Sequence, residues 1–307
     1  MKKMILALLL ALSLPLAVGH AELRPRDNDR ILASTAGDTA AKAVAGQVAT
    51  RMGFYPATSS ICAPETCDDY YKANVWSGLS YNYFYKTGPA ALVGGQTLGQ
   101  VGFDKWASDN LLLGFVVGGE RFNFSGPGEA RRKTAALTVL PYLGYRINDS
   151  LALDASIGHS WMDTNVWPED SDEAIYESRA QRFTTAAGLT KAGLFGPLAV
   201  SGRLGGLYLH QSKTYDQAMR PSEDGWHLFQ TSLSGRVVYL AGDFRPHFGL
   251  TYLQDFGRSG IDTAEADFNL GFTWAMTACS DLVLESVYGV RENMNKYGGR
   301  LALQLNF

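Results

Sequence analysis

His159 and Ser160 are adjacent residues whose types suggest catalysis, because a histidine can deprotonate a serine hydroxyl and make it a nucleophile. Adjacent side chains of a β-strand, however, point to opposite faces. The sequence here is strand-like, so we favour a histidine packed beside Trp161 over a serine–histidine pair. The remaining internal histidines do not have the spacing of metal ligands. They are His210, His227 and His247.

An acidic segment runs from Asp163 to Glu177 and contains six carboxylates. Clustered carboxylates are the hard oxygen ligands that Ca²⁺ prefers, but no EF-hand spacing accompanies them. A protease site at the rim of a barrel would need a histidine opposite Asp163, Asp170 or Asp172, and the sequence places none there. We therefore expect a solvated external loop, and we expect no metal, no cofactor and no catalytic residues.

Cys62 and Cys67 bracket a short, turn-prone loop. In an oxidising compartment such a pair would close a small disulfide ring. A metal site is the alternative, but no histidine lies nearby. Cys279 falls in an expected tight turn, where we read it as incidental.

The first 21 residues have the pattern of a secretory signal peptide, which we expect to be cut after Ala21. Lys2 and Lys3 precede an apolar run, and Gly19 to Ala21 form a small-x-small cleavage site. The apolar run is too short to span a membrane. No cysteine follows the cleavage site, so we do not expect a lipoprotein.

Composition excludes several classes of protein. The 307 residues are 46% hydrophobic and 19% charged, with 33 glycines and a net charge of −3. This balance disfavours a disordered chain and a general nucleic-acid binder. No stretch is apolar for long enough to be a membrane helix, so a helical membrane protein is also disfavoured.

Residues 22–72 differ in composition and residue pattern from the rest of the chain. Glu22 to Arg30 is charged and is expected to be unstructured. Ala36 to Met52 is alanine-rich and is expected to form a helix of about 17 residues, roughly 25 Å long. Its small side chains and weak apolar face are not those of a core helix.

From Val75 onwards apolar residues recur at every second position, which is typical of β-strands with one apolar face. In the last segment, for example, Leu301, Leu303 and Leu305 alternate with smaller or polar residues. The pattern predicts strands near 75–85, 93–106, 110–124, 131–147, 151–162, 176–192, 197–212, 224–240, 244–256, 261–277, 281–291 and 295–307.

These segments predict an all-β fold, a twelve-stranded antiparallel transmembrane β-barrel with the short N-terminal helix in or near its pore. An even number of long strands, joined by tight turns at one end and longer loops at the other, is the layout of outer-membrane barrels. A soluble β-sandwich is the alternative, but it does not explain strands of this length.

Charged residues on the polar faces are candidates for lining the pore. They are Asp104, Glu120, Arg146, Asp154, Arg182, Arg203, Arg236, Glu285, Arg291 and Arg300. They can be accommodated in a wet lumen or as pairs of opposite sign, so a conducting pore and a closed barrel filled by ion pairs both stay open. Aromatic residues near strand ends are candidates for interface girdles. They are Trp76, Tyr85, Trp106, Trp161, Tyr208 and Tyr239.

Three motifs resemble the start of an autotransporter β-domain: Trp76-Ser-Gly-Leu-Ser-Tyr, Gly102-Phe-Asp-Lys-Trp106, and Asp109-Asn-Leu-Leu-Leu-Gly-Phe-Val-Val-Gly-Gly119. The C-terminal Leu-Gln-Leu-Asn-Phe307 resembles the signal that the barrel-assembly machinery reads. The resemblance covers residues 73–307.

The resemblance implies type V secretion, in which a barrel in the Gram-negative outer membrane brings an N-terminal passenger to the surface. It also implies contacts with outer-membrane lipids, periplasmic chaperones and the barrel-assembly machinery, and a monomer. About 50 residues stand where family members carry hundreds, which favours a translocator or surface protein with a very short N-terminal segment. The alternative is a passive channel with a weak anion preference or a structural barrel protein, and a lipid-acting barrel enzyme is a third possibility.

Overall fold

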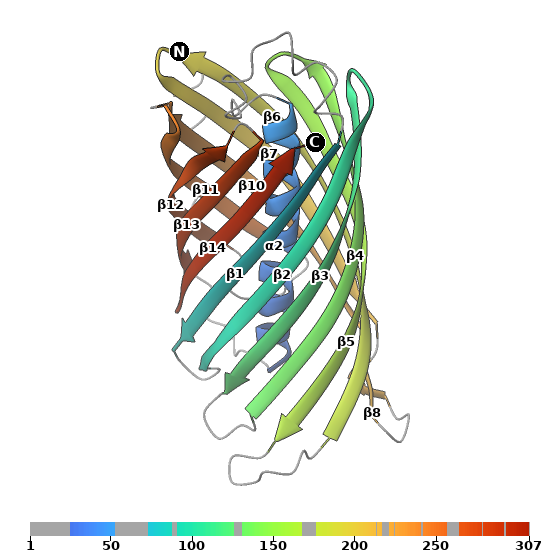
Figure 1. The fold of residues 1–307 in the computed structure, drawn as a ribbon. Helices are drawn as coiled ribbons and strands as arrows, with labels where there is room; N and C mark the ends of the chain where they lie inside the picture. Colours follow the sequence, from blue (N-terminus) through green and yellow to red (C-terminus); the bar gives the residue numbers. More distant parts are fainter. Residues whose placement is uncertain are drawn as a thin grey trace.

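The structure is a computed structural model, and β-strands dominate it (Figure 1). It describes residues 25–52, 73–87, 91–125, 131–167, 176–212, 214–216, 221–223, 225–240, 242–256, 264–277, 279–291 and 293–306.

The long strands of the barrel have the following bounds. They are β1 (Ala73–Lys86), β2 (Leu92–Ser108), β3 (Leu111–Ser125), β4 (Arg131–Asn148), β5 (Leu151–Trp167), β6 (Tyr176–Phe195), β7 (Leu198–Gln211), β10 (Trp226–Tyr239), β11 (Phe244–Phe256), β12 (Ala264–Thr277), β13 (Ser280–Arg291) and β14 (Met294–Asn306). Two short strands, β8 (Thr214–Asp216) and β9 (Pro221–Glu223), extend from β6 as a small hairpin between β7 and β10.

The sheet closes on itself as a twelve-stranded antiparallel barrel. The last strand, β14, pairs with β1 from Asn74↔Asn306 to Lys86↔Met294, and β5 pairs with β6, so the ring of long strands has no open edge. Closure satisfies the backbone polar groups that an open edge would leave exposed to lipid. The predicted all-β barrel is confirmed.

The two ends of the barrel differ in how their strands are connected. At one end, which we call the short-turn end, β2–β3, β4–β5, β6–β7, β10–β11 and β12–β13 are joined by two to four residues. Gly196 and Gly242 adopt positive φ angles of 60° and 61° in two of these turns, a conformation that glycine adopts at no steric cost. The opposite end, which carries the longest connections, is the long-loop end.

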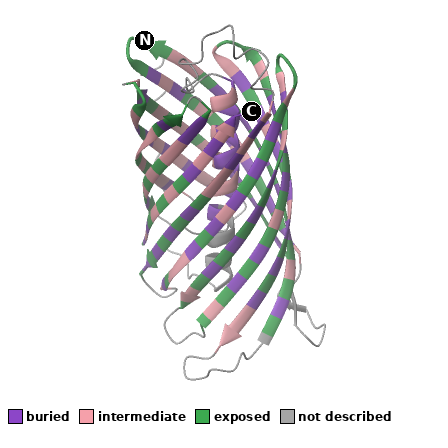
Figure 2. Ribbon diagram, in the orientation of Figure 1, coloured by how far each residue is buried: buried purple, intermediate pink, exposed green. Residues whose placement is uncertain are grey.

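Burial alternates along each strand (Figure 2). Large apolar side chains face outward and are exposed, as at Leu79, while the inward positions are mostly buried. Among the described residues, the predicted strand bounds agree with the structure to within three residues, except that β5 continues five residues further, to Trp167. Asp163 therefore lies on a strand and not in the expected loop.

The girdle prediction is wrong for two tryptophans. Trp76 is buried, and Trp106 packs against the same internal cluster. Each lies two residues from an inward-facing residue of its strand, Asn74 for Trp76 and Asp104 for Trp106, so its side chain also points into the barrel. Closeness to a strand end does not show to which side of the wall a side chain points. The other four aromatic residues proposed for the girdle are exposed on the outer face. They are Tyr85, Trp161, Tyr208 and Tyr239.

Within the described residues, one helix, α2 (Pro25–Arg51), runs inside the barrel (Figure 1). Its 27 residues span about 40 Å at 1.5 Å per residue. The predicted start at Ala36 and the unstructured assignment of Pro25 to Arg30 are therefore wrong. Proline is tolerated in the first turn of a helix, where its missing N–H has no helical partner, and no second proline follows it within the helix. Within the described part of the chain, no helix is both long and apolar enough to cross a membrane.

The helix runs from the long-loop end to the short-turn end. Ala36 packs against Phe84, Leu92 and Met294, which lie where strands meet at the long-loop end. Fifteen positions later, Arg51 pairs with Asp104, four residues before β2 ends at the short-turn end.

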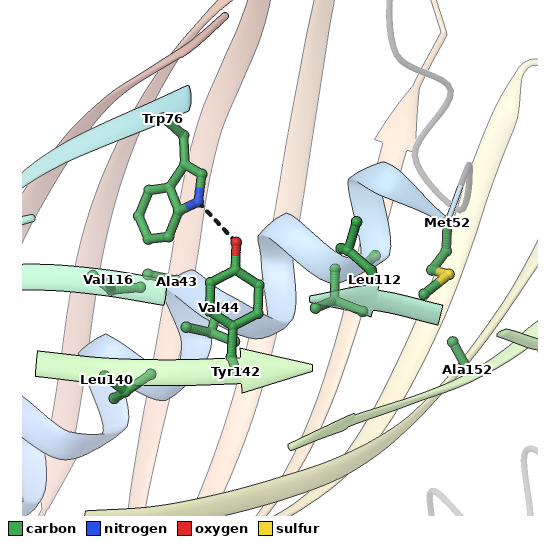
Figure 3. Packing of buried hydrophobic residues seen from close by; sticks show 11 residues of the cluster. Ala43, Val44, Met52, Trp76, Leu112, Val116, Leu140, Tyr142 and Ala152 are labelled. Carbon is green, nitrogen blue, oxygen red and sulfur yellow. Dashed lines mark hydrogen bonds between the residues drawn. The ribbon is translucent and has the colours of Figure 1, made fainter. Parts of the chain in front are cut away.

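One face of the helix forms an apolar core with the wall made by β1 and β3–β5 (Figure 3). Val44 and Val48 of the helix contact a cluster that includes Leu112 and Leu140. The expectation that this helix is a poor core helix is wrong, because inside a barrel the wall surrounds it. Small side chains are what the enclosed space accepts.

At Gly144 the wall lies close against the helix. A Cβ built at Gly144 would lie 2.6 Å from Cγ1 of Val48 and 3.0 Å from Cε of Met52. We predict that Gly144→Val forces the helix off the wall, at a cost of about 1–3 kcal/mol for overpacking, while the barrel still folds. Trypsin should then cleave at Lys42 or Arg51 in a barrel that still shows heat-modifiable gel migration.

Gly119→Val is the matched control, because Gly119 is exposed and has no atom within 4 Å of an added Cβ. If the two variants resist trypsin equally, the close packing at Gly144 does not hold the helix.

Candidate functional site in the barrel lumen

The candidate site is the lumen, where charged side chains of the wall meet the helix. The ten charged residues proposed from sequence all occupy inward positions of their strands. Five are buried, and five are half-buried. The buried residues are Asp104, Glu120, Asp154, Arg182 and Arg291, and the half-buried residues are Arg146, Arg203, Arg236, Glu285 and Arg300.

Near the short-turn end, Asp104 binds the C-terminal turn of the helix. Its carboxylate lies 3.0 Å from Nε of Arg51 and accepts a 3.1 Å hydrogen bond from the Gln47 amide. Tyr142 donates its hydroxyl to the same carboxylate at 2.8 Å and accepts the indole N–H of Trp76 at 3.1 Å (Figure 3). Because Asp104 is fully buried, these donors replace the water that its charge would otherwise require.

Closer to the long-loop end, a second network binds the helix through Lys42. Its ammonium lies 3.0 Å from Asp267 on β12 and 2.7 Å from Asp38, one turn earlier in the helix. Asp267 also pairs with Lys296 of β14 at 2.7 Å, and Lys296 in turn binds Glu265.

Arg291 extends this network across the wall. Its guanidinium reaches Glu265 at 3.0 Å and Asp255 at 3.1 Å, and all three side chains are almost completely buried. We call the six residues Lys42, Asp255, Glu265, Asp267, Arg291 and Lys296 the Lys42 network. Three acids alternate with three bases in it, so each buried charge has an opposite neighbour.

Two further pairs connect wall strands without the helix. Arg182 of β6 binds Glu120 of β3 at 2.5 Å across the interior. Arg203 of β7 binds both carboxylate oxygens of Asp154 on β5, at 2.6 and 3.1 Å. With the ion pair between Arg236 and Glu285 described next, the structure pairs six of the ten predicted residues with one another.

The remaining charges gather beside the helix on the wall formed by β10–β14. Glu285 lies 3.2 Å from Nε2 of His247 and 3.7 Å from Arg236. Two cavities adjoin Gly46 of the helix here, with volumes of about 90 and 110 Å³, and both are lined by Arg236 and Arg300. Arg146 lies apart, 5.1 Å over the ring of Trp106.

Sequence reasoning missed both helix cations and most of the Lys42 network. On β12, Glu265 and Asp267 alternate with the outward-facing residues, as Asn269 does, and on β14 Lys296 does so like Arg300. The alternation of the sequence could therefore have placed these three side chains in the lumen. Lys42 and Arg51 had no such signal, because the orientation of a helix within a barrel cannot be read from alanine-rich sequence.

The catalytic candidates do not converge. Ser160 faces inward and shares a 2.7 Å hydrogen bond with Thr138, while the ring of His159 lies 4.7 Å from that of Trp161. Among the described residues, no group of three or more His, Cys, Asp or Glu side chains could hold a metal ion. The signal peptide, Cys62, Cys67, Phe307 and the acidic residues 169–173 lie outside the described residues.

Comparison with known proteins gives a consistent picture. The family model described as autotransporter beta-domain matches residues 78–277. A search of curated proteins finds no match.

Among solved structures, the fold is similar to the translocator domain of the autotransporter NalP from Neisseria meningitidis. That match has 13% identity and a TM-score of 0.70, covering 92% of this chain and 98% of the other. The β-domain of the Bordetella autotransporter BrkA has 15% identity and a TM-score of 0.64, covering 77% of this chain and 100% of the other. The transport unit of AIDA-I from Escherichia coli has 11% identity and a TM-score of 0.59, covering 85% of this chain and 98% of the other.

The ion pairs of Arg51 and Lys42 with the wall are expected to contribute unequally to the stability of the helix in the lumen. In Arg51→Met, Asp104 keeps only the neutral donors Gln47 and Tyr142 among its described contacts, and breaking a buried pair costs about 3–5 kcal/mol. In Lys42→Met, Asp267 keeps Lys296, so we expect a loss of about 1 kcal/mol, as for a partly exposed pair. Hydrogen exchange of the helix amides measures both, and a larger loss in Lys42→Met would contradict this ranking.

Proposed function

We propose, because the chain belongs to the autotransporter β-domain family, that it carries its own N-terminal segment to the cell surface and then keeps helix α2 in the lumen. The protein is an outer-membrane autotransporter-type barrel. In such barrels the short turns face the periplasm and the longer loops face outward.

The direction of the helix is the observation that carries this proposal. Pro25 begins the helix on the long-loop side, and Arg51 ends it at the short-turn side next to Asp104. Residues that precede Pro25 would therefore emerge on the outer surface. A chain that had never crossed the membrane would instead enter the lumen from the periplasmic end.

The remaining parts of the proposal concern biogenesis. We propose export by the signal peptide at residues 1–21, chaperoned transit of the periplasm, and insertion by the barrel-assembly machinery that reads the C-terminal Phe307. We also propose that the barrel is a monomer without catalytic activity. The separation of His159 and Ser160 onto opposite faces supports the last point.

An epitope tag inserted between Ala21 and Glu22 tests the orientation. In intact cells we expect antibody and external protease to reach the tag, because the helix delivers the preceding residues to the outside. The same tag between Asp149 and Ser150, in a short turn, should become accessible only after the outer membrane is permeabilised. A tag at Ala21 that stays hidden in intact cells would reject the translocator proposal.

A passive channel is the second candidate function, and the cavities beside the helix favour it. Their lining includes five basic side chains and two acidic ones. These are Lys42, Arg203, Arg236, Arg245, Arg300, Asp281 and Glu285. Lys42 and Arg203 are paired with Asp267 and Asp154. The other lining charges are three basic and two acidic, and this small excess of positive charge in an enclosed space attracts anions.

Gly46 allows a test of the channel. No atom lies within 4 Å of a Cβ added there, and both cavities adjoin it, so Gly46→Leu should fill them without moving the helix. In planar bilayers a channel would give a small, anion-preferring current that falls by more than half in Gly46→Leu. Gly119→Leu adds the same side chain on the outer face and should leave the current unchanged. Absence of a steady current in the unaltered protein would reject the channel.

A further inference from the structure

The outer face of the barrel carries its charges in two separate places. Among the described residues of the twelve long strands, the outward-facing charges at the short-turn end are Lys105 and Lys191. At the long-loop end they lie on four neighbouring strands, β3 to β6. They are Arg121, Arg131, Lys133, Asp163, Glu177 and Arg179, which we call the β3–β6 rim.

Strand pairing brings the rim together. Arg121 of β3, Ala135 of β4, Asp163 of β5 and Arg179 of β6 form one continuous cross-strand row. Lys133 is the next outward position on β4. Four bases and two acids therefore share a patch of the outer wall.

Asp163 does not neutralise Arg179 fully. Asp163 lies 3.2 Å from Nε of Arg179, but the two side chains are 73% and 90% exposed, so this pair contributes little and leaves most of the guanidinium open. The Lys133 ammonium lies 4.9 Å from the ring centroid of Trp167, a contact that positions it without neutralising it.

The rim adjoins the apolar belt of the barrel. Leu137 lies four residues after Lys133 on β4, and Trp161 lies two residues before Asp163 on β5. The two are paired across the strands on the outer face and are 52% and 48% exposed. Elsewhere at the long-loop end the outer face carries exposed tyrosines, such as Tyr83 and Tyr297, in place of charges. The bases therefore lie where acyl chains end and lipid headgroups begin.

We propose that the β3–β6 rim binds the phosphates of a phosphorylated glycolipid in the outer leaflet of the membrane. Guanidinium groups match phosphate geometry with paired N–H donors, and long basic side chains can bury their stems on Leu137 and Trp161 while their heads reach the phosphates. The inference rests on the proposed function only for the assignment of the long-loop end to the outer leaflet.

Glycolipid binding by the purified full-length barrel tests this inference. Lipid A with both phosphates, presented in mixed detergent micelles, is the probe, and native mass spectrometry measures the bound fraction. We expect Arg121→Gln combined with Lys133→Gln to weaken binding at least tenfold. Lys105→Gln combined with Lys191→Gln removes the same charge at the opposite end and should change binding less than twofold. Heat-modifiable migration verifies that both variants are folded.

Three outcomes would overturn the inference. They are equal binding by both double variants, equal binding of dephosphorylated lipid A by the unaltered barrel, and displacement of lipid A by an equal concentration of inorganic phosphate. Loss of binding in the Lys105 and Lys191 variant alone would place the site at the short-turn end. The tag experiment fails or succeeds independently, because it reports on residues before the helix and not on the outer wall.

Discussion

The need to satisfy every backbone N–H and C=O group within lipid is the constraint on which this structure depends. The pairing of β1 with β14 meets it, since an unpaired edge would expose polar backbone to hydrocarbon. Closure of twelve strands has a second consequence. A barrel of about eight strands is just filled by its own side chains, so a wider one encloses space that something else must occupy. Here helix α2 occupies it.

Two kinds of interaction hold the helix: apolar packing determines which face meets the wall, and ion pairs determine its position along the barrel axis. Apolar packing of Val44 and Val48 against Leu112 and Leu140 fixes which face of the helix meets the wall. Packing by small side chains alone would let the helix slide along the axis. Lys42 and Arg51 are nine residues apart, about 13 Å along the helix, and each meets a buried acid on a different strand. A slide of one turn, about 5.4 Å, would separate both pairs at once.

Most of the barrel can be predicted from sequence because every second residue of a strand faces the same surroundings, either lipid or lumen. The outward face must match lipid, so alternation places the strands and the inward charges. What alternation cannot supply is the partner of each charge. Glu120 pairs with Arg182, which lies three strands away. Asp104 pairs with Arg51 of the helix, and the periodicity of the sequence does not predict which way that side chain points. Tryptophan is also ambiguous, since Trp76 donates its N–H to Tyr142 inside the barrel where a girdle was expected.

The lumen is divided unequally, and this asymmetry connects the helix to both candidate functions. The wall of β1 and β3–β5 offers apolar side chains, while the wall of β10–β14 offers Arg236, Arg300 and other polar groups. Val44 and Val48 of the helix pack on the first wall, and Ala41 packs in an apolar cluster of β6, β7 and β10. The cavities beside Gly46 remain where the wall carries polar side chains. Apolar packing and buried ion pairs together hold the helix in the lumen of this structure. The two cavities beside Gly46 lie where Arg236 and Arg300 line the wall. The packing that would retain the helix on one side of the lumen therefore also decides where a channel with anion preference would have to run.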